Sequence, residues 1–204
     1  MGHCLTIGTG KLSQAGFQTY TTLPEMTVCP FPQSMSFEAA AVIPLGLSTA
    51  MTALYMKDYL ALPYPKPGAP QPSGRSILIW GGSSSVGANA VQLAAASGLQ
   101  VAVTCSKRNH DMVKGLGATR VFDHSEASVV EKIVEFLSGS NYAGAFDTIG
   151  EPETLKLCGA VTEKLRGSLV VGTQPVPEGL SVGKGVAAVS CQSPFLPGVS
   201  CLGL

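Results

Sequence analysis

Charged residues are scarce in this sequence. Asp, Glu, Lys and Arg together make up 13% of its 204 residues, against about 25% in an average soluble protein. The thirteen acidic and thirteen basic residues balance, so the formal net charge is zero. A protein that binds nucleic acid by displacing counterions needs a basic excess, so we expect no nucleic-acid partner. With 45% hydrophobic residues, the chain has the composition of a globular protein with a large core.

Closely spaced metal ligands are also missing. The chain has six cysteines but no Cys-x-x-Cys pair, and its three histidines stand apart from them. Structural zinc sites are built from such close spacings, so we predict no metal site. Six cysteines are too few for the disulfide scaffold of a secreted protein. Reduced thiols and a cytoplasmic location follow as expectations.

Two long stretches without charge do not predict membrane spans. The stretch 39–56 contains Pro44 and Gly46, and the stretch 76–106 is interrupted by Gly-Gly-Ser-Ser-Ser at 81–85. Backbone in such a turn would be left without hydrogen-bond partners in lipid. We therefore expect no membrane partner.

Short apolar runs alternate with helical patterns through the middle of the chain. Helices are expected at 86–97 and 107–116, from a Ser128–Glu131 capping box to Gly139, and from Pro152 onward. The runs between them predict strands at 76–80, 100–104, 119–123, 144–149 and 169–172. Strands that alternate with helices form a parallel sheet covered on both faces. The fold class is therefore α/β, a doubly wound Rossmann sheet of about five strands.

The flanking regions are less regular. Residues 1–35 are extended and rich in turns, and 36–60 looks helical with interruptions at Pro44 and Gly46. The stretch 62–73 holds five prolines and is expected to be an exposed connector. Residues 173–204 show no clear periodicity, although 186–189 could extend the sheet.

A glycine-rich turn follows the first strand and opens a helix. Gly82, Ser84 and Gly87 fit the dinucleotide-binding pattern G-x-G-x-x-G with serine at its middle position. Free amides and the positive end of the helix dipole make such a turn an anion site. A P-loop would require Lys and Ser or Thr where Ala88 and Asn89 stand, so ATP is disfavoured. The Tyr-x-x-x-Lys pair of short-chain dehydrogenases is absent from the sequence.

The end of the second strand bears on the choice of cofactor. NAD-binding folds place Asp or Glu there, on the ribose hydroxyls, whereas this chain has Ser106, Lys107, Arg108 and Asn109. Two cations with polar neighbours suit the 2′-phosphate of NADP. The alternative is a solvated helix start whose cations face water. Because positive charge at a helix N-terminus is unfavourable without an anion, we favour the phosphate.

Several long stretches resemble one family of enzymes. LPEMTVCPFPQSMSFEAAAVIPLGLSTAMTALY, SILIWGGSSSVGANAVQLAAASG, TCSKRNHDMVKGLGATRVFDH and GAFDTIG follow one another at spacings that resemble the medium-chain dehydrogenase/reductase superfamily. Within it, the sequence is most similar to a fungal zinc-independent branch. That branch includes quinone-reductase-like proteins and trans-acting enoyl reductases of polyketide pathways. The resemblance covers residues 14–172.

The resemblance implies roles for individual residues. It places the NADP pyrophosphate on Gly82, Ser84, Ser85, Val86 and Gly87, and the 2′-phosphate on Ser106, Lys107 and Asn109. His124 stands where the family commonly has a tyrosine, and it could donate a hydrogen bond to the phosphate. Thr49 matches a catalytic threonine near the nicotinamide and the substrate carbonyl. Its hydroxyl could equally well bond to its own helix backbone.

The resemblance also implies a reaction and a domain organisation. The reaction is NADP(H)-dependent reduction of an enone or enoyl thioester, with a polyketide synthase as a candidate partner. Residues 1–35 would be a remnant of an N-terminal catalytic domain, with 15–22 as its closing strand. Residues 36–172 would form the cofactor-binding domain, and 173–204 an atypical tail. We therefore expect a chain truncated at both ends, with little or no activity. The alternatives are a non-catalytic NADP-binding module and, more weakly, a zinc alcohol dehydrogenase.

Overall fold

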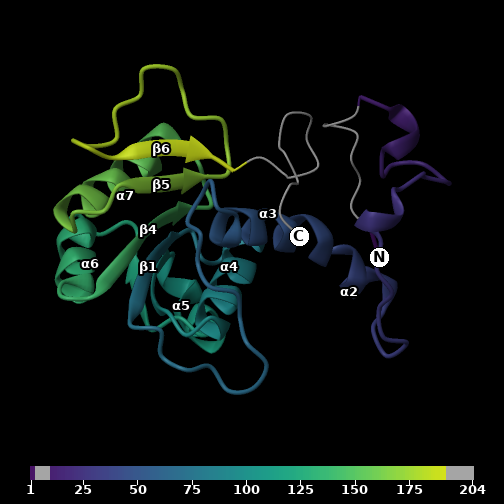
Figure 1. The fold of residues 1–204 in the computed structure, drawn as a ribbon, viewed down its shortest axis with the longest axis horizontal. Helices are drawn as coiled ribbons and strands as arrows, with labels where there is room; N and C mark the ends of the chain where they lie inside the picture. The colour runs from purple at the N-terminus through teal and green to yellow at the C-terminus, as the bar shows by residue number, and fades with distance from the viewer. Residues whose placement is uncertain (3–9, 192–204) are drawn as a thin grey trace.

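Six parallel strands form one sheet in the order β3-β2-β1-β4-β5-β6 (Figure 1). The structure is a computed structural model that describes residues 1–2 and 10–191, with Met26 described by its backbone alone. The strands are β1 Arg75–Trp80, β2 Gln100–Cys105, β3 Arg120–Asp123, β4 Asn141–Asp147, β5 Leu169–Gly172 and β6 Ala187–Ser190. The doubly wound parallel sheet is thus confirmed, with one strand more than five because the stretch near 186–189 pairs with β5.

Helices cover both faces of this sheet, and a further short helix, α2, lies away from it (Figure 1). The helices are α2 Phe37–Ala41, α3 Ile43–Tyr55, α4 Ser85–Ala96, α5 His110–Gly115, α6 Val129–Leu137 and α7 Pro152–Lys164. Three 3-10 turns, at Leu12–Gln14, Glu25–Thr27 and Lys107–Asn109, complete the elements. Side chains of α3, α4 and α5 share one buried cluster with the sheet, and those of α6 and α7 share a second.

Strand β1 shows why its sequence is apolar without alternation. Ile77 and Ile79 pack into the first cluster, whereas Leu78 and Trp80 pack into the second. All four side chains are at most 3% exposed. A strand that is buried on both faces has no solvent side on which polar residues would be favoured.

Two predicted helix starts are wrong in detail. The stretch 107–116 begins as a 3-10 turn, in which the Asn109 amide donates to the Ser106 carbonyl (2.8 Å), and α5 starts only at His110. Ser128 precedes α6 but makes no side-chain cap, because its backbone (φ −96°, ψ 18°) is not extended. An extended N-cap conformation is what brings the side chain to the free amides. Pro152 lies in the first turn of α7, as predicted.

The interruption predicted within 36–60 lies elsewhere. The break between α2 and α3 falls at Val42, whereas Pro44 sits in the first turn of α3, where it costs no hydrogen bond. Gly46 is inside α3, and a Cβ there would come within 2.8 Å of the Ser85 hydroxyl and 2.9 Å of the Asn89 amide nitrogen. Glycine at this position therefore permits α3 and α4 to pack closely rather than breaking the helix.

The predicted strand at 15–22 is also wrong. These residues form bends, and none of them belongs to a strand. A strand needs a neighbour to complete its ladder of hydrogen bonds, and in the described residues of the N-terminal segment the structure records one isolated bridge, between Gly2 and Val28. In Figure 1 the N-terminal residues and α2 lie beyond the end of α3, away from the sheet.

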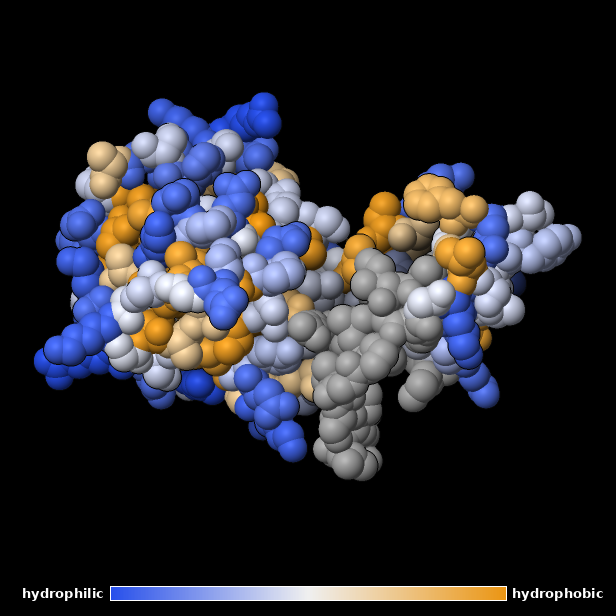
Figure 2. All heavy atoms as spheres, turned by 90° about the horizontal axis from the view of Figure 1, so that it is seen from above, coloured by the Kyte–Doolittle hydropathy of each residue, from blue (hydrophilic) through white to orange (hydrophobic). Residues whose placement is uncertain are grey.

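Large apolar side chains are exposed on this outlying part of the molecule. Phe17, Tyr20 and Phe37 are each at least 80% exposed, and orange surfaces gather on this region in Figure 2. The combined stretch Phe37–Tyr55 is long and apolar enough to cross a membrane by length and composition, and 33% of it is buried in the protein. The break at Val42 and the packing of α3 on α4 are those of a helix pair in a folded domain.

The cysteines that the structure describes are free thiols. Cys29 is exposed, while Cys105, Cys158 and Cys191 are buried. Burial raises the pKa of Cys191 to about 11 and that of Cys158 well above its ordinary value. These two groups therefore remain protonated at neutral pH, as expected of thiols in a core. Of the predicted tail 173–204, residues 192–204 lie outside the described residues.

Candidate functional site

The order of the strands predicts a ligand-binding crevice at the carboxyl ends of the central strands. Strand β1 lies between β2 and β4, so the chain winds outward in opposite directions from this central strand. In open parallel sheets, ligands bind outside the carboxyl ends of the strands at such a switch point. The turns that follow β1, β2 and β4 meet there, and the predicted cofactor-binding residues lie on the first two and on the neighbouring β3.

The turn after β1 is held close to β2 and to α4. The amides of Gly81 and Gly82 both donate to the Thr104 carbonyl, at 3.1 and 2.9 Å. Gly81 has φ of +84°, a conformation that favours glycine. A Cβ on Gly87 would lie 2.3 Å from the Gly81 carbonyl oxygen, so the start of α4 can approach the turn only without a side chain.

Helix α4 begins with free amides at this turn. Ser84 is its N-cap, and its hydroxyl accepts a hydrogen bond from the Gly87 amide (3.0 Å). The amides of Ser85 and Val86, in the first turn, have no acceptor within the helix. Their N–H groups and the helix dipole therefore offer a site for an anion, which agrees with the role that the resemblance implies.

The residues predicted to bind a second phosphate come together at the ends of β2 and β3. The Ser106 hydroxyl and His124 Nε2 are 3.2 Å apart. Lys107 and Arg108 are exposed on the 3-10 turn beside them. Asp123 is the nearest acid in the strand register, but its carboxylate accepts from the Ser125 amide and hydroxyl, which lowers its pKa. That carboxylate is engaged by its own turn, and the two cations remain available.

Asp147 and Thr148, which the sequence analysis did not single out, form the third part of the crevice. Asp147 is fully buried, and its Oδ1 accepts the amides of Ile149 (3.0 Å) and Gly150 (3.1 Å). The Thr148 hydroxyl reaches the carbonyl oxygens of Trp80 (2.8 Å) and Gly81 (3.0 Å). The sequence signal that could have identified Asp147 is a carboxylate at the last position of an apolar strand. A polar residue there lies at the carboxyl end of the sheet, where ligands bind.

Burial raises the pKa of Asp147 above its ordinary value of 3.8, although three hydrogen bonds favour the ionised form. A raised pKa in the folded state contributes stability below pH 4 that is lost as pH rises through the folded pKa. We therefore expect the unfolding free energy of wild type minus that of Asp147→Asn to fall as the pH rises above about 4. A single group limits this slope to about 1.4 kcal/mol per pH unit. Urea unfolding of both proteins measures it, and a difference that grows with pH would contradict the assignment.

In the described part of the chain, Thr49 makes no hydrogen bond to the residues at the ends of β1, β2 and β4. Its hydroxyl donates to the Leu45 carbonyl one turn earlier in α3 (2.8 Å). This is the local bond that the sequence left as the alternative to a catalytic role. The lone pairs of the oxygen can still accept, so a role near a substrate stays a prediction.

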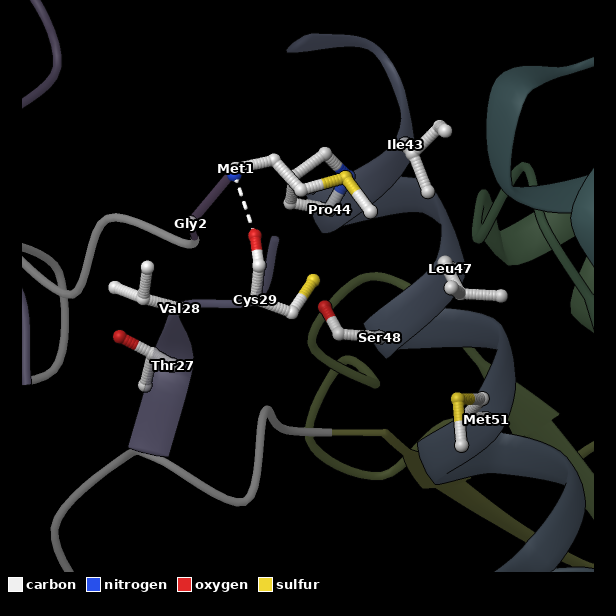
Figure 3. A pocket seen from close by; sticks show the side chains of 10 residues that line it. All are labelled: Met1, Gly2, Thr27, Val28, Cys29, Ile43, Pro44, Leu47, Ser48 and Met51. Carbon is white, nitrogen blue, oxygen red and sulfur yellow. Dashed lines mark hydrogen bonds between the residues drawn. The ribbon is translucent and has the colours of Figure 1, made fainter. Parts of the chain in front are cut away.

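An apolar cavity of about 300 Å³ lies between the N-terminal segment and α3 (Figure 3). Val28, Leu47 and Met51 are among its walls, and the Met1 amine donates to the Cys29 carbonyl (2.7 Å) at its rim. Among the residues that the structure describes, no side chain of Lys, Arg, His, Asp or Glu lines it, although the positively charged Met1 amine lies at its rim. The walls of the cavity are therefore mostly apolar.

Comparison with known proteins agrees with this geometry. The family model described as zinc-binding dehydrogenase matches residues 85–189, about half of the chain. The chain belongs to this family. It is a member of the medium-chain dehydrogenase/reductase superfamily, as its sequence motifs indicated. Because the members of this superfamily are dehydrogenases and reductases, membership implies a nicotinamide cofactor.

Individual relatives support the assignment. The trans-enoyl reductase himH of Aspergillus japonicus is 46% identical over 176 residues, which cover 86% of this chain and 49% of himH. Two crystal structures share the fold: CurK enoyl reductase (TM-score 0.65, 22% identity) and a quinone oxidoreductase from Pseudomonas syringae pv. Tomato DC3000 (TM-score 0.61, 24% identity). Each match covers 85% of this chain and 51% of the other. The chain thus spans about half the length of the proteins it matches.

The zinc in the name of the family finds no ligand set in the described residues. Between residues 10 and 191 there is no group of three His, Cys, Asp or Glu side chains close enough to hold a metal ion. The buried thiols are dispersed over β2, α7 and the end of β6. We therefore assign no step of a reaction to zinc in this part of the chain.

Proposed function

We propose that this chain is the cofactor-binding part of an NADP(H)-dependent, cytosolic oxidoreductase that reduces an enone or an enoyl thioester. The observation that carries the proposal is the cationic end of β2, where Lys107 and Arg108 flank the Ser106–His124 pair. No acid stands at the position where NAD-binding folds use one to bind the ribose hydroxyls. The 2′-phosphate of NADP supplies the anion that this arrangement needs.

The roles of the residues follow from their positions. The amides of Ser85 and Val86 would bind the pyrophosphate at the start of α4, while Gly82 and Gly87 allow the backbone to approach it. Ser106, Lys107, Arg108, Asn109 and His124 would bind the 2′-phosphate and the ribose. The donor chemistry of both groups fits a dinucleotide with an additional phosphate.

When bound, the dihydronicotinamide would supply a hydride to the β-carbon of the substrate, and protonation at the α-carbon would complete the reduction of the double bond. The protein contributes orientation and hydrogen bonds to the developing oxyanion. Thr49 is the residue of this chain that we propose near the substrate carbonyl. A polyketide synthase that carries the enoyl thioester is the corresponding candidate partner.

Binding and turnover are tested separately. The purified chain is titrated with NADPH and with NADH by fluorescence, and NADPH oxidation is then followed with an enone and with an enoyl thioester. We expect NADPH to bind at least about tenfold more tightly than NADH, with little turnover. Equal affinity for both cofactors would refute the NADP preference, and no binding of either would refute the cofactor site.

The same titration addresses a second candidate function, a cofactor-binding module without catalysis. This second function is worth testing because the chain spans only about half the length of the proteins it matches. Tight NADPH binding with no turnover on either substrate would support the module. Rates near those of a full-length relative would instead support an enzyme that is complete in this chain.

A further inference from the structure

The turns after β1 and β4 are joined by one side chain. Thr148 Oγ1 lies within hydrogen-bond distance of the Trp80 and Gly81 carbonyl oxygens and of Ser84 Oγ (2.9 Å). A threonine hydroxyl has one proton, which a carbonyl must accept because a carbonyl cannot donate. Thr148 therefore accepts from Ser84, and the Ser84 oxygen in turn accepts from the Gly87 amide (3.0 Å).

This chain of bonds determines what the first turn can offer to a ligand. The proton of Ser84 is directed to Thr148, so Ser84 serves as a helix cap rather than as a free donor. The donors that remain toward an anion are those of Ser85 and Val86, whose direction depends on how Ser84 holds the start of α4.

Asp147 in turn keeps Thr148 in place. Its Oδ1 accepts two amides of the same turn, and its Oδ2 accepts the hydroxyl of Thr154 in α7 (2.5 Å). The neighbouring contacts are tight as well, since a Cβ on Gly81 would lie 2.7 Å from Ile149 Cδ1. The turn thus has little room to move relative to the turn after β1.

We propose that Thr148 and Asp147 are positioning residues that orient the amides at the start of α4 toward the cofactor pyrophosphate. The proposal rests on the proposed function and deepens it, because it assigns the geometry of the pyrophosphate site to the last residue of β4 and the residue that follows it. Neither residue is proposed to touch the cofactor. They influence the α4 amides through Ser84.

The test compares two ligands. NADPH needs the pyrophosphate site, whereas adenosine 2′-monophosphate needs only the end of β2. Thr148→Val keeps the shape of the side chain and removes the hydroxyl, and we expect it to weaken NADPH about tenfold and adenosine 2′-monophosphate by less than about twofold. Thr148→Ser restores the hydroxyl and should return NADPH affinity to that of wild type. Calorimetry measures the dissociation constants of wild type and of both variants.

A matched control removes another buried hydroxyl. Thr162 is fully buried in α7, and its hydroxyl donates to the Cys158 carbonyl and lies 3.1 Å from that of Tyr142, away from the crevice. Thr162→Val should lower stability without changing either affinity. If it weakens NADPH as much as Thr148→Val does, the effect is a general loss of structure and the positioning role is refuted.

The remaining outcomes distinguish a failure of the positioning role from a failure of the proposed function. Wild-type affinity for NADPH in Thr148→Val, or tighter binding by a freed Ser84, overturns the inference and leaves the proposed function intact. Failure of the wild-type chain to bind NADPH overturns both. If Thr148→Val does not fold, Asp147→Asn decides in its place, with an expected loss of about fivefold for NADPH alone.

Discussion

Replacing Gly87 by alanine is expected to weaken NADPH binding by about 100-fold and to destabilise the protein by about 2 kcal/mol. The new Cβ would lie 2.3 Å from the Gly81 carbonyl oxygen and 2.8 Å from the Gly82 Cα, and neither backbone atom can move aside alone. Overpacking of this kind costs about 3 kcal/mol, which the better helix propensity of alanine offsets by about 1 kcal/mol. Urea unfolding and fluorescence titration measure the two effects.

Gly115 provides the matched control for this substitution. It is the last residue of α5, and a Cβ there meets no atom within 4 Å. Gly115→Ala should therefore leave NADPH affinity unchanged and raise stability by up to about 1 kcal/mol. A Gly87→Ala protein that matches this control in stability and affinity would show that the close approach at α4 is not needed.

Removing the two cations after β2 is expected to affect one cofactor and not the other. Each charge-assisted contact with a phosphate is worth about 1.5 kcal/mol, so Lys107→Ala with Arg108→Ala should weaken NADPH about 100-fold. NADH lacks the 2′-phosphate, and its affinity should change by less than about threefold. The ratio of the two dissociation constants reports on the 2′-phosphate site directly.

The control for this experiment changes the net charge equally at the opposite edge of the sheet. Lys66 lies in the connector before β1, and Lys164 is the last residue of α7, before β5. Both are exposed. Their double alanine variant should keep the wild-type preference. If both double variants weaken NADPH and NADH alike, the cations act through the general field of the protein, and the assignment to a 2′-phosphate is wrong.

Local sequence patterns predicted the elements correctly where burial determines which residue types occur. The apolar run at 77–80 predicted a strand covered on both faces, and Pro152 marked the start of a helix because its ring suits the first turn. The same reasoning failed at Ser128, whose sequence fits a cap but whose backbone is not extended. The strand predicted at 15–22 rested on the family resemblance, and among the described residues no neighbouring strand completes a ladder there.

The order of residues along the chain was enough to predict the doubly wound domain, the glycine-rich turn after β1 and the cationic end of β2. Each depends on residues close together in the chain, through apolar periodicity, glycine and charge. The hydrogen bond between Thr148 and Ser84, which are 64 residues apart, and the contacts by which Asp147 holds the turn that carries Thr148 became visible only in the folded protein. Those contacts follow from the parallel pairing of β1 with β4, and no local pattern encodes which strands become neighbours.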